Sequence, residues 1–266
     1  MQGRLTYTTV AAATALCAYG AFLWFVATVE TANYVRTKGM EPPTSPESMA
    51  PPPRILWLFS DAVNLHAAGN AKANPAYVLR HMTPDAARDY VRTECPLVVE
   101  AYDLVKPMAY KADIFRYCAL WKDGGVYVDD DLELRMSLSD ERLDAPGALL
   151  LVSDKLEWAV APPRVVVARM WNAFMIARTP GSPTLACALA HAASNIIARK
   201  THISTLGLTG PRLLRNCLRE SSDVGFVGYN KGRAQGAFTW DGSQLVTHHV
   251  VNRSTVEDYS KMQWYR

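Results

Sequence analysis

The chain has 266 residues, of which 49% are hydrophobic and 20% are charged, and its formal net charge is +3. This is an ordinary globular composition, with enough length for one domain that buries a sizeable core. The small net charge and the lack of a lysine and arginine block argue against a nucleic-acid partner, and no fixed-period repeat is present.

The N-terminal segment 5–29 contains no charged residue. At about 1.5 Å per residue a helix of this length spans about 37 Å, enough to cross a hydrocarbon core of about 30 Å. Arg4 precedes the segment and Glu30 follows it, which favours a cytosolic N-terminus. We therefore expect a transmembrane signal anchor. The alternative is a cleaved signal peptide, whose apolar region is usually shorter, about 7–15 residues.

Residues 38–53, "KGMEPPTSPESMAPPP", are dense in proline and polar residues. Such a segment buries too little apolar surface to fold and acts as an extended spacer. The sequence thus predicts three regions. Residues 1–30 form a cytosolic tip and an anchor, residues 31–53 form a stem, and residues 54–266 form a globular domain.

The domain alternates apolar runs with segments of helical spacing. Four helices are predicted, two of which begin with Thr-Pro or Ser-Pro, a pattern typical of helix starts. The alternation predicts an α/β fold around a mainly parallel sheet, in which ligands lie beyond the carboxyl ends of the strands. The expected strands are 54–60, 75–82, 126–128, 147–154, 164–178 and 245–251, and the expected helices are 83–91, 106–124, 182–200 and 210–220.

The chain has five cysteines, of which Cys17 lies in the expected anchor. The other four, Cys95, Cys118, Cys187 and Cys217, allow three complete pairings. A lumenal domain permits disulfides, although Cys118 could equally be a buried free thiol. None of the cysteines has the CxxC spacing of a structural zinc site.

The stretch "GGVYVDDDLEL" places three aspartates directly after a short apolar run, 126–128. Because side chains alternate along a strand, Asp129 and Asp131 are expected on one side and Asp130 on the other. Two carboxylates on one side suit a hard cation such as Mg²⁺ or Mn²⁺ that is completed by water and phosphate. The alternative is a solvated acidic turn.

The preceding helix carries Asp113 and Arg116, three residues apart and so on one helix face. A surface ion pair worth about 0–1 kcal/mol is the simpler explanation. However, the surrounding segment is apolar and leads through Gly124 and Gly125 directly to the aspartates.

The stretch "AYKADIFRYCALWKDGGVYVDDDLEL", residues 109–134, closely resembles the DXD-containing sugar transferases of glycosyltransferase family 32. The family signature is Ala-x-x-Ser/Ala-Asp-x-x-Arg-Tyr, an apolar helix, and then Gly-Gly-x-Tyr-x-Asp-x-Asp. Weaker similarity extends over most of residues 54–254. The resemblance implies a GT-A-type fold that binds a nucleotide sugar and a divalent cation.

The resemblance also implies roles for individual residues. Asp131 matches the aspartate that ligates Mn²⁺ or Mg²⁺, and Asp129 matches the one that contacts the sugar and ribose of the donor. Asp113 and Arg116 match the helix pair that holds the donor, with the arginine near the diphosphate. Tyr127, the tyrosine of the signature, completes the donor-binding set.

Further along the chain, Asn172 matches an asparagine near the transferred sugar, and with the two aspartates it is expected to be catalytic. His249 matches a histidine that contacts the metal or the diphosphate, and the adjacent His248 could take its place. Either histidine could also be purely structural. Thr209 lies in "LTGP", residues 208–211, a segment that resembles one in the family. Asp130 occupies the variable middle position of the DXD motif.

The resemblance and the expected anchor together imply a single-pass type II protein of the Golgi or ER membrane with a lumenal catalytic domain. The implied reaction moves a hexosyl group from a UDP- or GDP-sugar to a glycan or glycolipid acceptor with retention of configuration. The donor sugar, the acceptor, a covalent intermediate and the oligomeric state are left open.

Two departures from the family pattern favour an alternative, a non-catalytic protein that binds a sugar nucleotide or a carbohydrate. The first expected strand has Trp57 but no histidine, and Val251 replaces an aromatic residue. A metal-dependent phosphohydrolase is a third possibility, but it explains neither the helix pair nor the two glycines.

Overall fold

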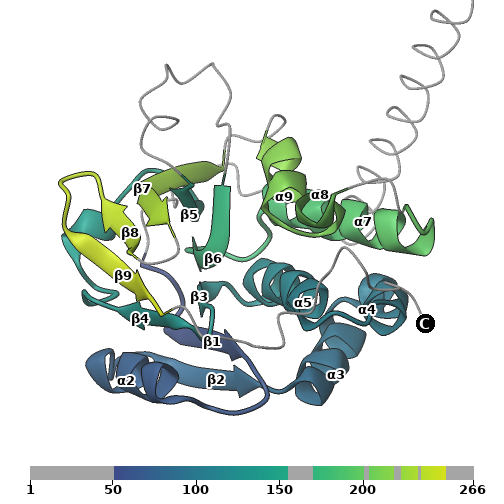
Figure 1. Cartoon of the computed structure of the whole chain (residues 1–266), viewed down its shortest axis with the longest axis horizontal. Helices are drawn as coiled ribbons and strands as arrows, with labels where there is room; N and C mark the ends of the chain where they lie inside the picture. The colour runs from purple at the N-terminus through teal and green to yellow at the C-terminus, as the bar shows by residue number, and fades with distance from the viewer. Residues whose placement is uncertain (1–50, 155–169, 201–203, 219–222, 233–234, 250–266) are drawn as a thin grey trace, which may run out of the picture. The chain divides into compact units, whose positions relative to one another are not determined.

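The computed structural model describes residues 51–154, 170–200, 204–218, 223–232 and 235–249 (Figure 1). The expected anchor, the stem up to residue 50 and Val251 lie outside the described residues. Within those residues no helix is both long and apolar enough to span a bilayer.

The described residues form a mixed sheet of nine strands in the order β2-β1-β3-β6-β5-β7-β8-β9-β4. Only the pairs β1/β2, β1/β3 and β5/β7 are parallel. The strands are β1 Ile55–Phe59, β2 Val78–Met82, β3 Gly125–Val128, β4 Leu132–Leu134, β5 Leu149–Ser153, β6 Met170–Ala177, β7 Val224–Gly232, β8 Gly236–Thr239 and β9 Gln244–His248.

The expectation of a mainly parallel sheet is therefore wrong. β6 inserts between β3 and β5 and runs antiparallel to both. The last strands, β7, β8 and β9, follow one another without an intervening helix and pair antiparallel. A parallel pair needs a long crossover connection, whereas antiparallel neighbours can be joined by a tight turn.

The helices occupy two positions around the sheet. α3, α4, α5, α7, α8 and α9 gather on one side of it, and α2 lies apart from them, near β2 and against β4 (Figure 1). The bounds are α2 Leu65–Ala73, α3 Pro84–Glu94, α4 Val99–Leu104, α5 Met108–Lys122, α7 Pro183–Ile197, α8 Thr205–Leu208 and α9 Pro211–Cys217, with short 3-10 turns at Pro96–Val98 and Glu141–Leu143.

The central helix α5 is buried almost all round, from Ala112 to Trp121. It packs between β1 and β3 on one side and α3 and α7 on the other. Phe115 on α5 contacts Trp57 and Phe59 of β1, with ring centroids 5.9 and 5.8 Å apart. A helix that is buried on all faces places even its polar residues, here Asp113 and Arg116, in the interior.

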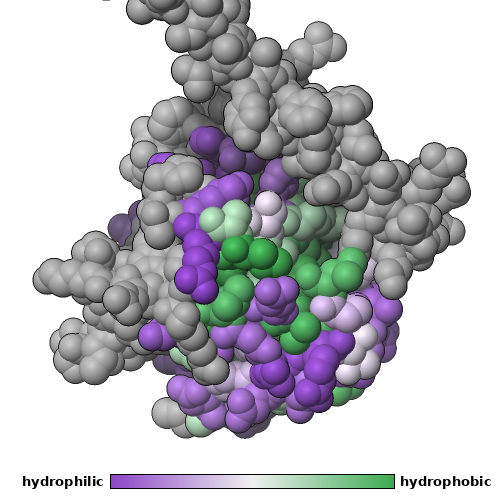
Figure 2. Space-filling model, turned by 90° about the vertical axis from the view of Figure 1, so that its right-hand side faces the viewer, coloured by the Kyte–Doolittle hydropathy of each residue, from purple (hydrophilic) through white to green (hydrophobic). Residues whose placement is uncertain are grey.

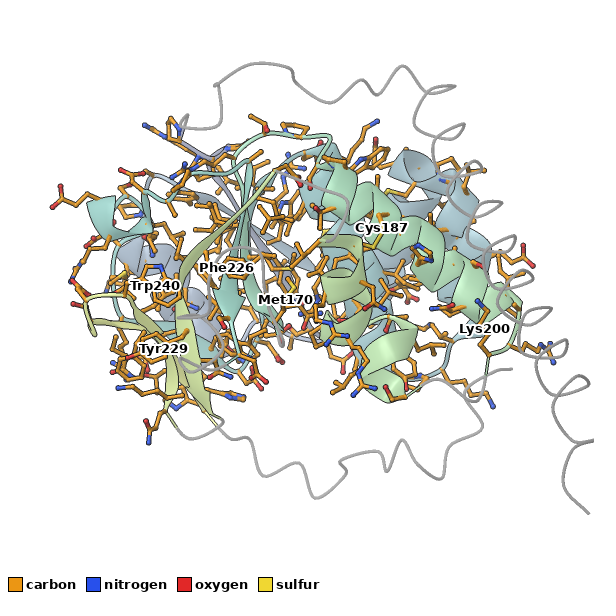
Figure 3. All side chains as sticks on the ribbon, turned by 90° about the horizontal axis from the view of Figure 1, so that it is seen from above. Met170, Cys187, Lys200, Phe226, Tyr229 and Trp240 are labelled. Carbon is orange, nitrogen blue, oxygen red and sulfur yellow. A yellow bond between two sulfur atoms is a disulfide. The ribbon has the colours of Figure 1, made fainter. Side chains whose placement is uncertain are left out.

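Two disulfides reinforce this helical layer. Cys95 at the end of α3 pairs with Cys118 on α5, and Cys187 on α7 pairs with Cys217 on α9 (Cys187 is labelled in Figure 3). The structure thus selects one of the three pairings that the sequence allows, and Cys118 is not a free thiol.

Two surface features lie outside the sheet core. The side of the domain with α3, α4 and α7 shows an apolar patch among hydrophilic residues (Figure 2). Leu97 and Ile197, two large exposed apolar residues, lie on elements that pack together there. On the β7–β8 hairpin, Tyr229 stacks on Phe238 and Trp240 with ring centroids 6.2 and 6.0 Å apart.

Candidate functional site

The aspartates follow the buried strand β3 at the carboxyl end, as the sequence predicts. Gly124 and Gly125 turn the chain from α5 into β3 with φ angles of +67° and +96°. A Cβ atom on Gly125 would lie 2.7 Å from the Ile55 carbonyl oxygen, so only glycine fits there. The Asp129 amide then donates to the Ala173 carbonyl (2.9 Å), which extends the β3/β6 ladder to the first aspartate.

Asp113 lies at the centre of a buried polar network. It is 8% exposed, and both of its carboxylate oxygens accept hydrogen bonds. Thr209 Oγ1 donates to Oδ2 (2.8 Å) and Asn172 Nδ2 donates to Oδ1 (2.9 Å). Burial raises the pKa of Asp113, while Arg116 and the two hydrogen bonds act in the opposite direction. The network therefore supplies the partners that a buried carboxylate requires.

Arg116 connects this network to the aspartates. Its guanidinium donates to the Asn172 carbonyl (2.6 Å) and lies 3.1 Å from Asp129 Oδ1 and 3.5 Å from Asp113 Oδ1. It also stacks over the Tyr127 ring at 4.5 Å. Burial opposes its charge, but the nearby acidic groups, led by Asp129, raise the pKa of Arg116 and keep it protonated.

Asp129 is held by protein groups yet remains open to solvent, with 28% of its side chain exposed. The Tyr127 hydroxyl donates to its Oδ1 atom at 2.9 Å. The pKa of Asp129 is raised to about 6, chiefly by burial and also by Asp131 and Asp130, while Arg116 and the Tyr127 hydroxyl act in the opposite direction. A cation bound beside Asp129 would favour its ionised form and so lower this pKa.

The two adjacent histidines at the end of β9 contact different carboxylates. His248 Nε2 lies 3.1 Å from Asp131 Oδ2. The backbone amide of His249 donates to the Asp131 carbonyl (2.9 Å), but its ring lies 2.8 Å from Glu133 Oε2 and stacks on His66. The structure thus brings His248, the alternative to His249, to the Asp131 side chain. That His249 contacts the metal or the diphosphate stays a prediction.

The residues present at the aspartates fit a hard cation. Carboxylate oxygens are the ligands that Mg²⁺ and Mn²⁺ prefer, and such ions keep water and phosphate ligands as well. Asp129, Asp131 and His248 would supply the protein ligands. Among the residues that the structure describes, two groups bring three His, Cys or carboxylate atoms within 4.8 Å of one another, and neither includes the aspartates. One is His66, Glu133 and His249; the other is Cys187, His191 and Cys217, whose two sulfur atoms are already joined in a disulfide.

Asn64 and Asn70 on the α2 side support the aspartate segment, and neither was predicted from the sequence. Asn64 caps α2 by accepting from the Ala67 amide (2.9 Å), and its Nδ2 donates to the Asp130 carbonyl. Asn70 Nδ2 donates to the Leu132 carbonyl (2.9 Å), and its Oδ1 accepts from the Leu134 amide (2.8 Å). Asparagine is a preferred N-cap residue, so Asn64 carried a usable local signal; nothing local marks Asn70.

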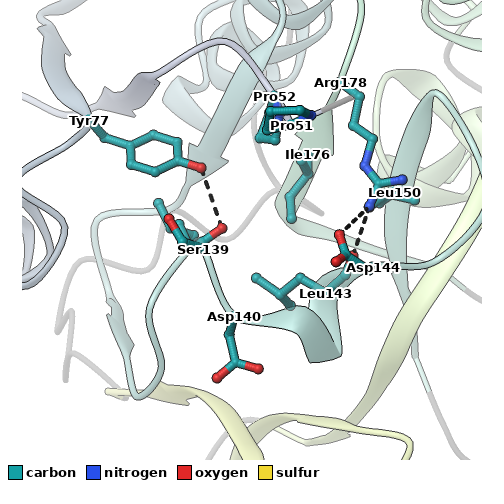
Figure 4. Close-up of a pocket in the computed structure, with 11 residues that line it drawn as sticks. Pro51, Pro52, Tyr77, Ser139, Asp140, Leu143, Asp144, Leu150, Ile176 and Arg178 are labelled. Atoms are coloured by element: carbon teal, nitrogen blue, oxygen red, sulfur yellow. Dashed lines mark hydrogen bonds and ion pairs between the residues drawn. The ribbon is translucent and has the colours of Figure 1, made fainter. Parts of the chain in front are cut away.

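A separate cavity of about 250 Å³ lies at the other end of β3 (Figure 4). Arg178, which follows β6, contacts Asp144 at its wall at 3.1 Å. Because Ala177 pairs with Gly125, the start of β3, this cavity is distinct from the aspartate site. Its lining is Pro51, Pro52, Tyr77, Leu138, Ser139, Asp140, Leu143, Asp144, Leu150, Ile176 and Arg178.

The segment that contains α5 and the aspartates is similar to a known family of sugar transferases. Residues 60–147 match the family model described as "Glycosyltransferase sugar-binding region containing DXD motif". No curated protein matches the chain in sequence. Among solved structures it is similar to "PaToxG Glycosyltransferase", with 14% sequence identity over 74% of this chain and 78% of that chain and a TM-score of 0.44. The matched residues 60–147, which include Asp113, Arg116 and the aspartates, are therefore similar to the sugar-binding region of DXD-containing glycosyltransferases, and the match does not select family 32.

Proposed function

We propose that the protein is a metal-dependent glycosyltransferase of the family 32 type with a GT-A-type fold. It moves a hexosyl group from a UDP- or GDP-sugar to a glycan or glycolipid acceptor, with retention of configuration. The observation that carries the proposal is the pair of aspartates after β3, one of them tied by Arg116 to a buried network, inside the segment that matches the sugar-binding model.

The charges of the site account for the chemistry. A nucleoside diphosphate that leaves a sugar gains negative charge as the glycosidic bond breaks. Bound Mg²⁺ or Mn²⁺ would stabilise that charge by Lewis-acid interaction with the diphosphate oxygens. Asp131 and Asp129 would hold the cation, and His248, 3.1 Å from Asp131, is the histidine best placed to assist.

In this proposal Arg116 acts through Asp129 and does not touch the diphosphate. Its side chain is only 5% exposed, and two of its three guanidinium nitrogens face the Asn172 carbonyl and Asp129. It therefore fixes the direction of the Asp129 carboxylate. Asp113 has a similar positioning role on the preceding turn of α5, where Asn172 and Thr209 saturate its oxygens. Pre-organised charges of this kind need no rearrangement as charge develops on the leaving group.

We place the domain in the lumen of the Golgi or ER, behind a signal anchor at residues 5–29. The uncharged segment supports this placement. The two disulfides also support it, because disulfides persist in oxidising compartments and are rare in the cytosol. Retention of the full chain in the membrane fraction after alkaline washing, and its loss when residues 1–30 are deleted, would be the expected result. Release of the full chain by the wash would count against an anchor.

A screen of nucleotide sugars tests the catalytic proposal. The purified protein is incubated with each UDP- and GDP-hexose and Mn²⁺, and release of the nucleoside diphosphate is measured with and without candidate acceptors. We expect one donor to be turned over by the native protein and not by the Asp129→Ala variant. Tight binding of a donor that is never turned over would instead favour the alternative, a non-catalytic sugar-nucleotide-binding protein.

A further inference from the structure

His66, Glu133 and His249 form a cluster beside the aspartates that the proposed reaction does not use. Their potential ligand atoms all lie within 4.8 Å of one another. His249 Nε2 is 2.8 Å from Glu133 Oε2, and the rings of His66 and His249 stack with centroids 3.9 Å apart. We propose that these three residues bind a divalent transition metal of the Zn²⁺ type, at a site separate from the cation of the aspartates.

The fold brings the three residues together from three elements. Glu133 is the middle residue of β4, and His249 follows β9, whose pairing with β4 continues through the hydrogen bond from the His249 amide to Asp131. His66 lies in the first turn of α2. The cluster therefore joins segments that are 67 and 116 residues apart in sequence, and a metal there would link α2 to the β4–β9 pair.

The backbone positions of the cluster are fixed before any metal binds. Asn64 caps the N-terminus of α2 and holds the Asp130 carbonyl. Asn70, one turn after His66 and on the same helix face, makes two hydrogen bonds to the backbone of β4. Since α2 is anchored on both sides of His66, binding would need only side-chain rotation, which lowers its entropic cost.

The geometry and the ligand types favour Zn²⁺ over Mg²⁺. In a tetrahedral site with metal–ligand distances near 2.1 Å the ligand atoms are about 3.4 Å apart. His249 Nε2 and Glu133 Oε2, now 2.8 Å apart, would separate to reach this spacing, and the distances to His66, at most 4.8 Å, would adjust by rotation of the side chains. Two imidazoles with one carboxylate and an open position suit zinc and similar transition metals, whereas Mg²⁺ prefers an all-oxygen octahedron. The Glu133 and His249 side chains are 32% and 35% exposed, which gives an ion access from solvent.

One neighbouring charge opposes the metal and provides a diagnostic control. Arg135 Nη2 lies 2.9 Å from Glu133 Oε2, and Arg135 Nε also donates to Thr247 Oγ1 (2.7 Å). The guanidinium competes with a cation for the Glu133 carboxylate. Removing it should therefore strengthen metal binding, a gain that damage to the fold would not produce.

The experiment measures Zn²⁺ binding to the full oxidised chain by competition with a chromophoric chelator. We expect one equivalent of Zn²⁺ to bind at this cluster, and the Asp129→Asn/Asp131→Asn variant, which lacks the aspartate site, to retain that equivalent. His66→Ala and Glu133→Gln should weaken it more than about 100-fold, because each removes a direct ligand and even outer partners cost about 10–100-fold. Arg135→Gln should bind more tightly. The Asp129→Asn/Asp131→Asn variant and His191→Ala, a residue beside the Cys187–Cys217 disulfide, should retain native affinity.

Each alternative outcome would overturn the proposal. These outcomes are the absence of Zn²⁺ binding by the native chain, native affinity in both His66→Ala and Glu133→Gln, and loss of binding only in the aspartate or His191 variants. Circular dichroism checks that the variants fold. If His66→Ala does not fold, Arg135→Gln decides, since unchanged or weaker binding in that variant contradicts a site that includes Glu133.

Discussion

Replacement of Arg116 by methionine tests whether the ion pair between Arg116 and Asp129 has the energy of a buried pair or that of an exposed one. Methionine keeps most of the volume of the side chain and removes the guanidinium. The variant would lose the ion pairs at 3.1 Å to Asp129 and at 3.5 Å to Asp113, together with the hydrogen bond to the Asn172 carbonyl. Two carboxylates would be left without their cation in a region where the arginine side chain is only 5% exposed.

The expected loss in the free energy of unfolding at pH 7 is about 3–5 kcal/mol, the usual cost of removing one partner of a buried ion pair. This loss should shrink at lower pH. Burial already raises the pKa of Asp113, and it raises that of Asp129 to about 6. Without the arginine both values rise further above those of the unfolded chain, so the folded variant binds protons more tightly. The penalty is therefore full above these pKa values and is relieved as the pH falls through them.

Urea unfolding at pH 7 and pH 5 measures both effects. Arg88→Met is a matched control, because Arg88 makes an ion pair with Asp103 at 2.6 Å while its side chain is 40% exposed. An exposed pair contributes about 0–1 kcal/mol. If Arg116→Met cost no more than Arg88→Met, or if its cost did not change between the two pH values, the reasoning about the buried network would be refuted.

Two further substitutions test individual contacts. Thr209→Val removes the hydroxyl that donates to Asp113 Oδ2, so a buried carboxylate oxygen loses its partner. The free energy of unfolding, measured in urea, should fall by about 1–3 kcal/mol. A fall below about 0.5 kcal/mol would show that water replaces the hydroxyl. Gly125→Ala should lower the thermal unfolding midpoint by more than Gly242→Ala does. Both glycines have left-handed φ angles, but of the two only Gly125 would place a Cβ atom against backbone, 2.7 Å from the Ile55 carbonyl oxygen. Equal falls in the unfolding midpoint would mean that the structure relaxes this clash.

The elements set by local sequence signals were predicted correctly. Thr83 and Ser182 cap α3 and α7 with their hydroxyls, ahead of the prolines that marked the helix starts. The turn from α5 to β3 falls at Gly124 and Gly125, the two glycines at the end of the expected helix 106–124, and Gly124 has a left-handed φ of +67°. Caps and glycine turns depend on neighbouring residues alone, so a single sequence is sufficient to find them.

The sheet could not be derived in the same way. β4 has three residues, β7 contains glycines at positions 225, 228 and 232, and α2 has little amphipathic pattern, so none of the three was predicted. The antiparallel insertion of β6 between β3 and β5 depends on contacts between distant segments. Tertiary packing of this kind overrides local strand propensity.

In the candidate site, too, the residues of a continuous motif were predicted and the contacts between distant segments were not. The aspartates and the Asp113–Arg116 pair were found because the motif is continuous in sequence. Which of His248 and His249 reaches Asp131 depends on the register of β4 against β9, which two adjacent histidines do not reveal. The contact of Thr209 with Asp113 spans 96 residues and has no local signal.

The most direct test of the central claim is metal-dependent nucleotide binding by an Asp131→Asn variant, with Asp130→Asn as a control of equal charge. Titration calorimetry with UDP and GDP is carried out in the presence of Mn²⁺ and again with a chelator. We expect native protein and Asp130→Asn to bind one of the nucleotides only with the metal, and Asp131→Asn to bind it at least about tenfold more weakly, the minimum expected when metal ligation is disturbed. Equal metal-dependent affinity of all three proteins would contradict the account.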